Sequence, residues 1–389
     1  MNNIVLFSQH LPLAIIWIIS LIREGNSLDQ IIENKIKQYD KNGILEYMFQ
    51  DLLDILRATD LPTFNVFQVM SITHFPLSED DIQRILKISD SSRSSLHDSL
   101  KKLVEYSLCT SQLNRYSLKS LAREYGVSTL RNEPVSESHF RNSLKAYILC
   151  LAEGNGGDDW GSYRDKYEVL NSYWENIKEL FSSLQASWKD DFSCSYLDAK
   201  KLWKMLQRFT YLYGYWSVRE EWTKALIDEA QVQGDNIFCA ELLAANGWIS
   251  LMREGEVNVN SACNNFEEAM ILLREIEMQD TDYRLYNDVT LTILLNLAAA
   301  KVRQRAFINA KEIFHMFLSL WRKTTTIEQR KNCIENRIYN RFYIRYLLYR
   351  GEYFYRRNLP WRAERYYHLV DNLCQKIEWA RFSAKANER

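Results

Sequence analysis

Apolar side chains recur every three or four residues along most of this chain, which is the spacing that buries one face of an α-helix. The first such stretch starts at Pro12, a residue suited to the first turn of a helix, and stops at Gly25 and Asn26. A second helix is expected to begin at Ser27 and to end near Arg57. The pattern predicts a mainly α-helical protein that opens with a fragment of a helical bundle.

The segment from residue 60 to residue 126 has shorter units. Ser78 precedes three acidic residues and therefore predicts a capped helix start. Two strand-like runs come last and are joined through Asn114. The expected elements are helices over residues 65–73, 79–88 and 92–106 and strands over residues 108–113 and 115–118. Three helices followed by a β-hairpin predict a winged helix.

Residues 127–195 are expected to form a helical linker region. The chain is polar as far as Ser138, and helices are expected over residues 140–151 and 167–184. Between them, the glycine-rich run 154–159 predicts a flexible loop. The predicted division of the chain is 1–59, 60–126, 127–195 and 196–389.

The last of these parts repeats a pattern of small and large residues. Tetratricopeptide repeats have this pattern because two antiparallel helices approach closely only where one side chain is small. The matching residues are Gly247, Ala262, Phe266 and Ala269, then Ala298, Ala310 and Phe314, then Gly351, Phe354, Ala363 and Tyr367. A weaker unit comprises Leu206, Phe209, Val218, Trp222 and Ala225, with a turn at Gly214. The fold predicted is a winged-helix domain followed by an α-α superhelix of tetratricopeptide-like repeats; unrelated helical hairpins are the alternative.

Composition agrees with a helical array. The 389 residues include only 12 glycines and 5 prolines, and no proline lies between Pro134 and Pro360. Turn-rich sandwiches and barrels need more of both residues.

Charge and cysteine content indicate a cytoplasmic protein. The formal net charge is −1, so no global field attracts nucleic acid or an acidic membrane. The seven cysteines form no Cys-x-x-Cys pair, which favours reduced thiols. The apolar N-terminal stretch is interrupted by Gln9, His10 and Pro12, and its longest part is shorter than the roughly 20 residues of a membrane span. A buried helix is therefore expected there rather than a signal peptide or a membrane span.

The order of the parts resembles the C-terminal two thirds of STAND-type signalling ATPases of the NB-ARC class. In that family a Gly-Leu-Pro-Leu-Ala element opens the helical domain, and its proline packs against adenine. Here the element reads Leu11-Pro12-Leu13-Ala14 after His10. The family also has a motif near the end of the winged helix whose histidine reaches the ADP phosphate. The frame from Arg115 to Tyr125 follows that motif, with Lys119 at the histidine position.

The phosphate loop of that family is missing. No Gly-x4-Gly-Lys-Ser/Thr sequence occurs, and no apolar strand ends in paired acids. The resemblance therefore implies a chain that does not hydrolyse ATP alone, either a truncated or split gene product or a degenerate relative. ADP or ATP is expected only together with a separate nucleotide-binding domain, and Pro12 and Lys119 are then the candidate nucleotide contacts.

Residues for catalysis or for metal binding are not grouped in the sequence. The six histidines are scattered without a His-x3-His or His-Glu-x-x-His spacing, and no Gly-x-Ser-x-Gly elbow occurs. No enzymatic activity and no metal site are expected.

A stripe of arginines near the C-terminus is the candidate binding surface. Arg337, Arg341 and Arg345 are four residues apart on one helix, beside Tyr339 and Tyr343. Such a surface can bind a phosphate, an acidic peptide or single-stranded nucleic acid. The alternative is that the aromatic rings fill the interior of the repeats while the arginines face solvent.

DNA binding through the winged helix is the alternative function. Residues 89–125 carry six basic and four acidic side chains, a small excess for contacts with phosphates. The sequence therefore favours a non-catalytic regulatory or sensor portion of a STAND-type signalling protein that binds a ligand, most simply a protein, through its repeats. A transcription regulator that binds DNA through the winged helix is the second hypothesis.

Overall fold

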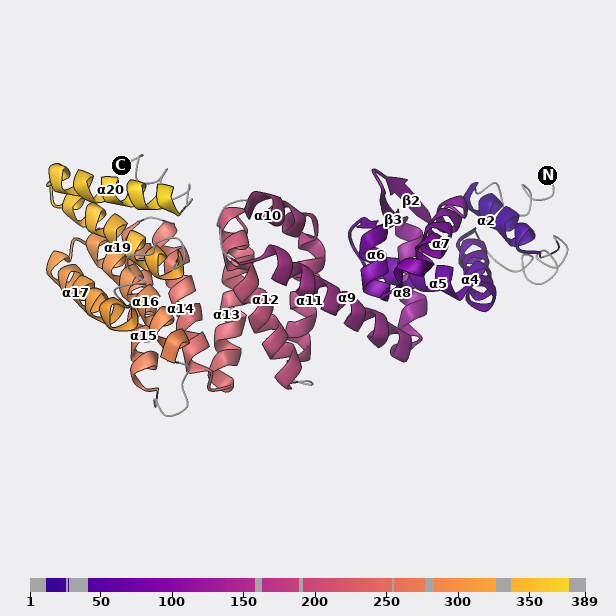
Figure 1. Ribbon diagram of the computed structural model, residues 1–389. Coiled ribbons are helices and arrows are strands. Elements are labelled where there is room, and N and C mark those ends of the chain that lie inside the picture. Colours follow the sequence, from indigo (N-terminus) through magenta and orange to yellow (C-terminus); the bar gives the residue numbers. More distant parts are fainter. Residues whose placement is uncertain are drawn as a thin grey trace. The chain divides into compact units, whose positions relative to one another are not determined.

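The computed structural model describes residues 12–25, 27, 41–157, 163–188, 192–253, 255–276, 283–326 and 337–377. These residues form two compact units, which are described separately. The first comprises Met1–Gly154 with Val169–Ser183, and the second comprises Asn155–Glu168 with Leu184–Arg389. The prediction of a mainly α-helical fold is confirmed, since the described residues hold a single small sheet (Figure 1).

Among the described residues of the first unit, two helices precede residue 60. They are α2 (Pro12–Arg23) and α4 (Lys41–Thr59). Trp17 of α2 is fully buried, lies against the ring of Phe49 with 5.4 Å between ring centroids, and donates its indole N–H to the carbonyl oxygen of Tyr106. Gly25, with φ of +95°, follows α2 as expected. The helix start expected after Ser27 lies outside the described residues.

The next elements include the predicted helices and the predicted β-hairpin, with one additional short strand. They are α5 (Leu61–Ser71), β1 (Leu77–Ser78), α6 (Glu79–Leu86), the short 3-10 helix η2 (Asp90–Ser92), α7 (Arg93–Glu105), β2 (Cys109–Gln112) and β3 (Arg115–Leu118). The antiparallel sheet has the strand order β1-β3-β2. Leu113 and Asn114 both have positive φ, which is the geometry of a tight hairpin turn. Strand β1 was not predicted, because two residues give no alternating pattern.

A buried carboxylate joins three parts of the first unit. Asp81 forms the predicted cap of α6, where its backbone N–H donates to the hydroxyl of Ser78 and its carboxylate accepts from the backbone of Ser78. The same carboxylate accepts hydrogen bonds from the hydroxyls of Tyr147, at 2.6 Å, and Tyr173. Burial by itself raises the pKa of Asp81, but these hydrogen bonds outweigh it and hold the pKa below its usual value.

The helices around the linker region differ in extent from those expected. The helix expected over residues 140–151 lies within the longer α9 (Pro134–Asn155), and α8 (Ser120–Arg131) precedes it. Gly126 lies where α8 meets α5: a Cβ there would be 2.1 Å from the hydroxyl oxygen of Ser71. The helix expected over residues 167–184 is two helices, α10 (Tyr163–Ser172) and α11 (Trp174–Ser187), separated at Tyr173.

The second unit contains consecutive helices that pack in pairs (Figure 1). They are α12 (Phe192–Leu212), α13 (Trp216–Val232), α14 (Asn236–Met252), α15 (Glu256–Arg274), α16 (Tyr283–Arg303), α17 (Phe307–Thr324), α19 (Arg337–Arg356) and α20 (Pro360–Lys376). Gly214 has φ of +78° in the predicted turn between α12 and α13.

Close helix contacts confirm the repeat register read from the sequence. A Cβ on Gly247 of α14 would be 2.7 Å from the ring of Phe266 in α15. A Cβ on Gly351 of α19 would be 2.4 Å from the ring of Tyr367 in α20. Ala298 and Ala310 are fully buried where α16 meets α17. In the pairs α14/α15 and α19/α20, an aromatic residue of the second helix fills the space left by a glycine of the first.

The sequence also led to expectations about membrane spans, disulfides and the division of the chain. Within the described residues, no helix is long and apolar enough to cross a membrane. None of the six cysteines that the structure describes is in a disulfide. The division into four parts at residues 59, 126 and 195 stays a prediction.

Candidate functional site

A groove in the second unit brings together side chains from four pairs of helices. Its volume is about 230 Å³, and its walls come from α12, α14, α16 and α19, the first helix of each pair, with one residue from α13. Ala244 and Ala245 of α14 line it, and their short side chains leave room there. The charged residues that line it are Arg208, Arg219, Arg341, Arg345, Glu241 and Asp288. We call this feature the arginine groove.

Arg345 of α19 is held rigidly in the groove. Its side chain is buried, and Nη2 donates to the side-chain oxygen of Asn296 in α16 at 2.5 Å. The guanidinium carbon lies 5.7 Å from the ring centroid of Trp248 and 5.9 Å from that of Tyr349. Its positive charge is therefore stabilised by ring faces and an amide, without a carboxylate in ion-pair distance among the described residues.

Arg219 of α13 is also buried in this groove, with 7% of its surface exposed. Its Nη1 donates to the backbone oxygen of Gln207 at 2.7 Å, whereas Nε has no hydrogen-bond acceptor. Among the described residues, no carboxylate lies within ion-pair distance. Burial lowers the pKa of Arg219 to about 10, so the guanidinium is still protonated at neutral pH.

One of the two carboxylates in the groove is compensated by a neighbouring lysine. Glu241 lies 3.2 Å from Nζ of Lys204 and accepts a hydrogen bond of 3.0 Å from the side-chain amide of Gln207. Four guanidinium groups and two carboxylates line the groove, so positive charge is in excess. This arrangement suits an anionic ligand.

The residues of the predicted stripe have different environments in the structure. Arg341 and Arg345 line the arginine groove. Tyr343 is half-buried and stacks on Trp321 of α17, with 4.9 Å between ring centroids, so it contributes to packing. Burial raises the pKa of Tyr343. The side chains of Arg337 and Tyr339 lie outside the described residues.

Residues contributed by other helices were missed from the sequence, and the repeat register contains a signal that identifies some of them. Glu241, Thr292 and Arg345 each precede the small residue of their unit by six positions, and all three line the groove. This periodicity marks one face of the first helices. Arg208 and Arg219 belong to the weakest unit, where the register gave no such guide.

The two nucleotide candidates of the resemblance lie in the first unit. Pro12 is the exposed first residue of α2. Lys119 is the exposed N-cap residue of α8, and its backbone N–H donates to the carbonyl oxygen of Leu108 at 3.0 Å. Their roles stay predictions that depend on a nucleotide-binding domain.

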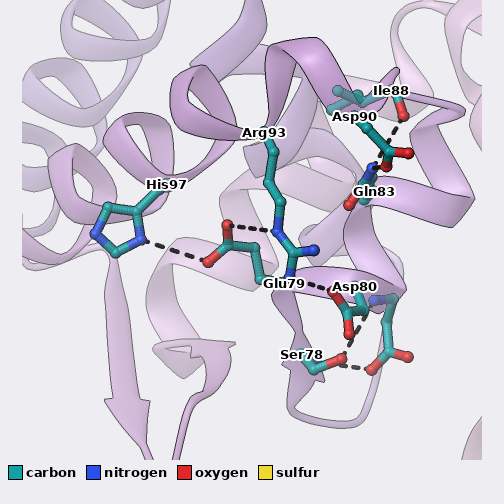
Figure 2. Close-up of polar contacts among 9 residues, drawn as sticks. Ser78, Glu79, Asp80, Gln83, Ile88, Asp90, Arg93 and His97 are labelled. Carbon is teal, nitrogen blue, oxygen red and sulfur yellow. Dashed lines mark hydrogen bonds and ion pairs between the residues drawn. The ribbon is translucent and has the colours of Figure 1, made fainter.

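The basic residues of α7 are largely engaged by carboxylates. Figure 2 shows Arg93 between two acids of α6: its Nη2 donates to Asp80 at 2.5 Å, and its Nε lies 3.7 Å from Glu79. The ring of His97 lies 3.4 Å from the same Glu79. Lys102 pairs with two further acids, at 2.8 and 3.3 Å. Little positive charge is therefore left on this helix for phosphates of DNA.

Metal-binding groups of three or more His, Cys, Asp or Glu side chains do not occur among the described residues.

Comparisons with known proteins give a distant structural likeness and no match in sequence. No family model matches the sequence, and no curated protein matches it. A solved structure that matches is a signal transduction ATPase with numerous domains (STAND), with a tetratricopeptide repeat sensor, from Pyrococcus horikoshii. The TM-score is 0.34 and the identity 11%, over 97% of this chain and 62% of that protein, so this chain spans less than two thirds of its length. Functional inferences therefore have to rest on the residues of this chain.

Proposed function

We propose that this chain is the non-catalytic sensor portion of a signalling protein and that it binds a protein ligand in the arginine groove. The observation that carries the proposal is the pair of buried arginines, Arg219 and Arg345, which line one groove without carboxylate partners. Burying a charge without a compensating partner costs roughly several kcal/mol of stability. The two buried arginines therefore favour a ligand that supplies the opposite charge.

The position of the groove supports a protein as the ligand. Its walls come from the first helices of four successive pairs, so residues far apart in sequence form one continuous surface. Stacked helical repeats use such surfaces to bind extended segments of other proteins.

The first unit is proposed to couple ligand binding to a separate nucleotide-binding domain. Because the sequence has no phosphate loop, ADP or ATP would be bound by that domain, with Pro12 and Lys119 as the contacts from this chain. The acids that engage Arg93 and Lys102 support a protein partner over DNA for the winged helix.

Site-specific crosslinking tests this function. A photoreactive amino acid in place of Arg208 probes the groove, and the same amino acid in place of Ile271, an exposed residue of α15, is the matched control. We expect a protein from the organism that encodes this chain to be captured at position 208 and not at position 271. The captured protein, once purified, should bind the parent chain and fail to bind the variant Arg208→Glu/Arg341→Glu. Equal capture at both positions, or equal binding by the variant, would contradict the proposal.

A further inference from the structure

The uncompensated charge in the arginine groove restricts the chemistry of its ligand. Arg219 and Arg345 are each more than nine-tenths buried, and neither has a carboxylate within ion-pair distance among the described residues. Arg208 and Arg341 bring two more guanidinium groups to the same walls. The excess of positive charge in the groove therefore suits a ligand with more than one negative charge.

The hydrogen-bond donors of the groove also favour an anionic ligand. An arginine has five N–H donors; Arg345 uses one of them on Asn296, and Arg219 uses one on the backbone oxygen of Gln207. Nε of Arg219 is buried without any acceptor. The remaining N–H groups at the Nη atoms of the two arginines are the donors that acceptor oxygens of a ligand would take.

A phosphate group matches this set of donors better than a carboxylate does. A carboxylate carries one charge and two oxygens, and the fork of one guanidinium can already contact both of them. A phosphate monoester carries about 1.5 to 2 negative charges at pH 7 and three acceptor oxygens. Arg219 and Arg345 line the same groove, so their guanidinium groups offer more donors to such a group than a single carboxylate needs.

The acids of the groove do not remove this preference. Glu241 is compensated by Lys204, and Asp288 is the other carboxylate that lines the groove, so four guanidinium groups still leave positive charge in excess. The volume of about 230 Å³ corresponds to about seven or eight water molecules, which is room for a phosphorylated side chain. Leu285, Val289 and Phe342 add apolar wall beside the charges, suited to residues that flank the phosphate.

We infer that the arginine groove binds a phosphate monoester carried on a protein segment, with Arg219 and Arg345 as its two buried contacts. This inference rests on the proposed function, because it takes the groove to be the ligand site. It adds the chemical class of the ligand.

Titration calorimetry and fluorescence anisotropy with the full chain test which chemical class of ligand the groove binds. The probes are inorganic phosphate and two peptide libraries of equal length, one with phosphoserine and one with glutamate at a central position flanked by random residues. We expect the phosphoserine library to bind at least about tenfold more tightly than the glutamate library, and inorganic phosphate to compete with it. Raising the salt concentration should weaken binding.

Variants connect the binding to the groove. Arg219→Met keeps the volume of the side chain and removes the charge, so phosphoserine binding should fall at least about tenfold while the melting temperature in phosphate-free buffer stays the same or rises. Arg274→Gln, at an exposed position of α15 that does not line the groove, is the matched control and should bind as the parent does. If Arg219→Met does not fold, Arg341→Gln on the groove wall replaces it, with an expected loss of about fivefold or more.

Three results would overturn the inference: equal affinity for the two libraries, no binding of either library by the folded parent chain, or full affinity in Arg341→Gln and Arg219→Met. If a protein is nevertheless captured at position 208, the proposed function stands and only the phosphate class is rejected. If the phosphoserine library binds but no protein is captured, the phosphate site is supported and the protein-sensor function is the part that fails.

Discussion

Replacing Gly351 by alanine tests the packing that defines the repeats. A Cβ at this position would lie 2.4 Å from one ring carbon of Tyr367 and 2.8 Å from another, so the ring or the helix has to move. Overpacking of this kind costs about 1 to 3 kcal/mol. Alanine also stabilises a helix interior relative to glycine by about 0.5 to 1 kcal/mol. The expected net loss in the free energy of unfolding is about 1 to 2 kcal/mol.

Thermal denaturation followed by circular dichroism measures this loss. For a unit of about this size, the melting temperature should fall by about 2 to 8 °C. Gly154→Ala is the matched control, because Gly154 is helical and nothing lies within 4 Å of its added Cβ. That variant should keep or slightly raise the stability of its own unit.

A second substitution separates the close contact from other effects. In a Tyr367→Leu background the ring is gone, so Gly351→Ala should stabilise the protein through helix propensity alone, by about 0.5 to 1 kcal/mol. The reasoning is refuted if Gly351→Ala is as stable as the parent, or if its effect is the same with and without the ring of Tyr367.

Three further predictions concern other positions. Ala310→Trp and Ala363→Trp should each destabilise the second unit by about 1 to 3 kcal/mol or more, because both alanines are buried where helices meet; unchanged melting temperatures in both would show that the repeat register is wrong. The pKa of Asp81 is lowered in the folded state, so its contribution to stability is present above the pKa of the unfolded chain and is lost as the pH falls through the lowered value. Asp81→Asn should therefore flatten the acid side of a plot of stability against pH, and an unchanged acid side would contradict this. The chain alone should show no magnesium-dependent ATP binding at micromolar concentrations in calorimetry. Once a nucleotide-binding domain is supplied and binds ADP, Lys119→Ala should weaken that binding; equal affinity would reject the phosphate role of Lys119.

The repeat register could be predicted because its signal is local. Gly247 and Phe266 lie in adjacent helices, and the requirement for one small and one large residue is written within a single helical pair. The hairpin turn at Asn114 and the cap at Ser78 were predictable for the same reason.

The groove could be predicted only in part. Arg341 and Arg345 belong to one helix, so their spacing revealed them. Arg208 and Arg219 join them only after four pairs of helices have stacked, which no local pattern encodes. The break between α10 and α11 at Tyr173 was missed for a similar reason. The hydroxyl of Tyr173 donates a hydrogen bond to Asp81, which is 92 residues away in the sequence.

Asp81 also links helices of the first unit that are far apart in the sequence. Its carboxylate takes part in the N-terminal cap of α6. The same group accepts hydrogen bonds from Tyr147 of α9 and from Tyr173, which directly precedes α11. Moving any one of these partners away leaves the others bonded to a buried acid that has lost part of its solvation. The backbone amides of α6, α9 and α11 should therefore exchange their hydrogens with solvent as one cooperative group, even though Asp81 and Tyr173 are 92 residues apart along the chain.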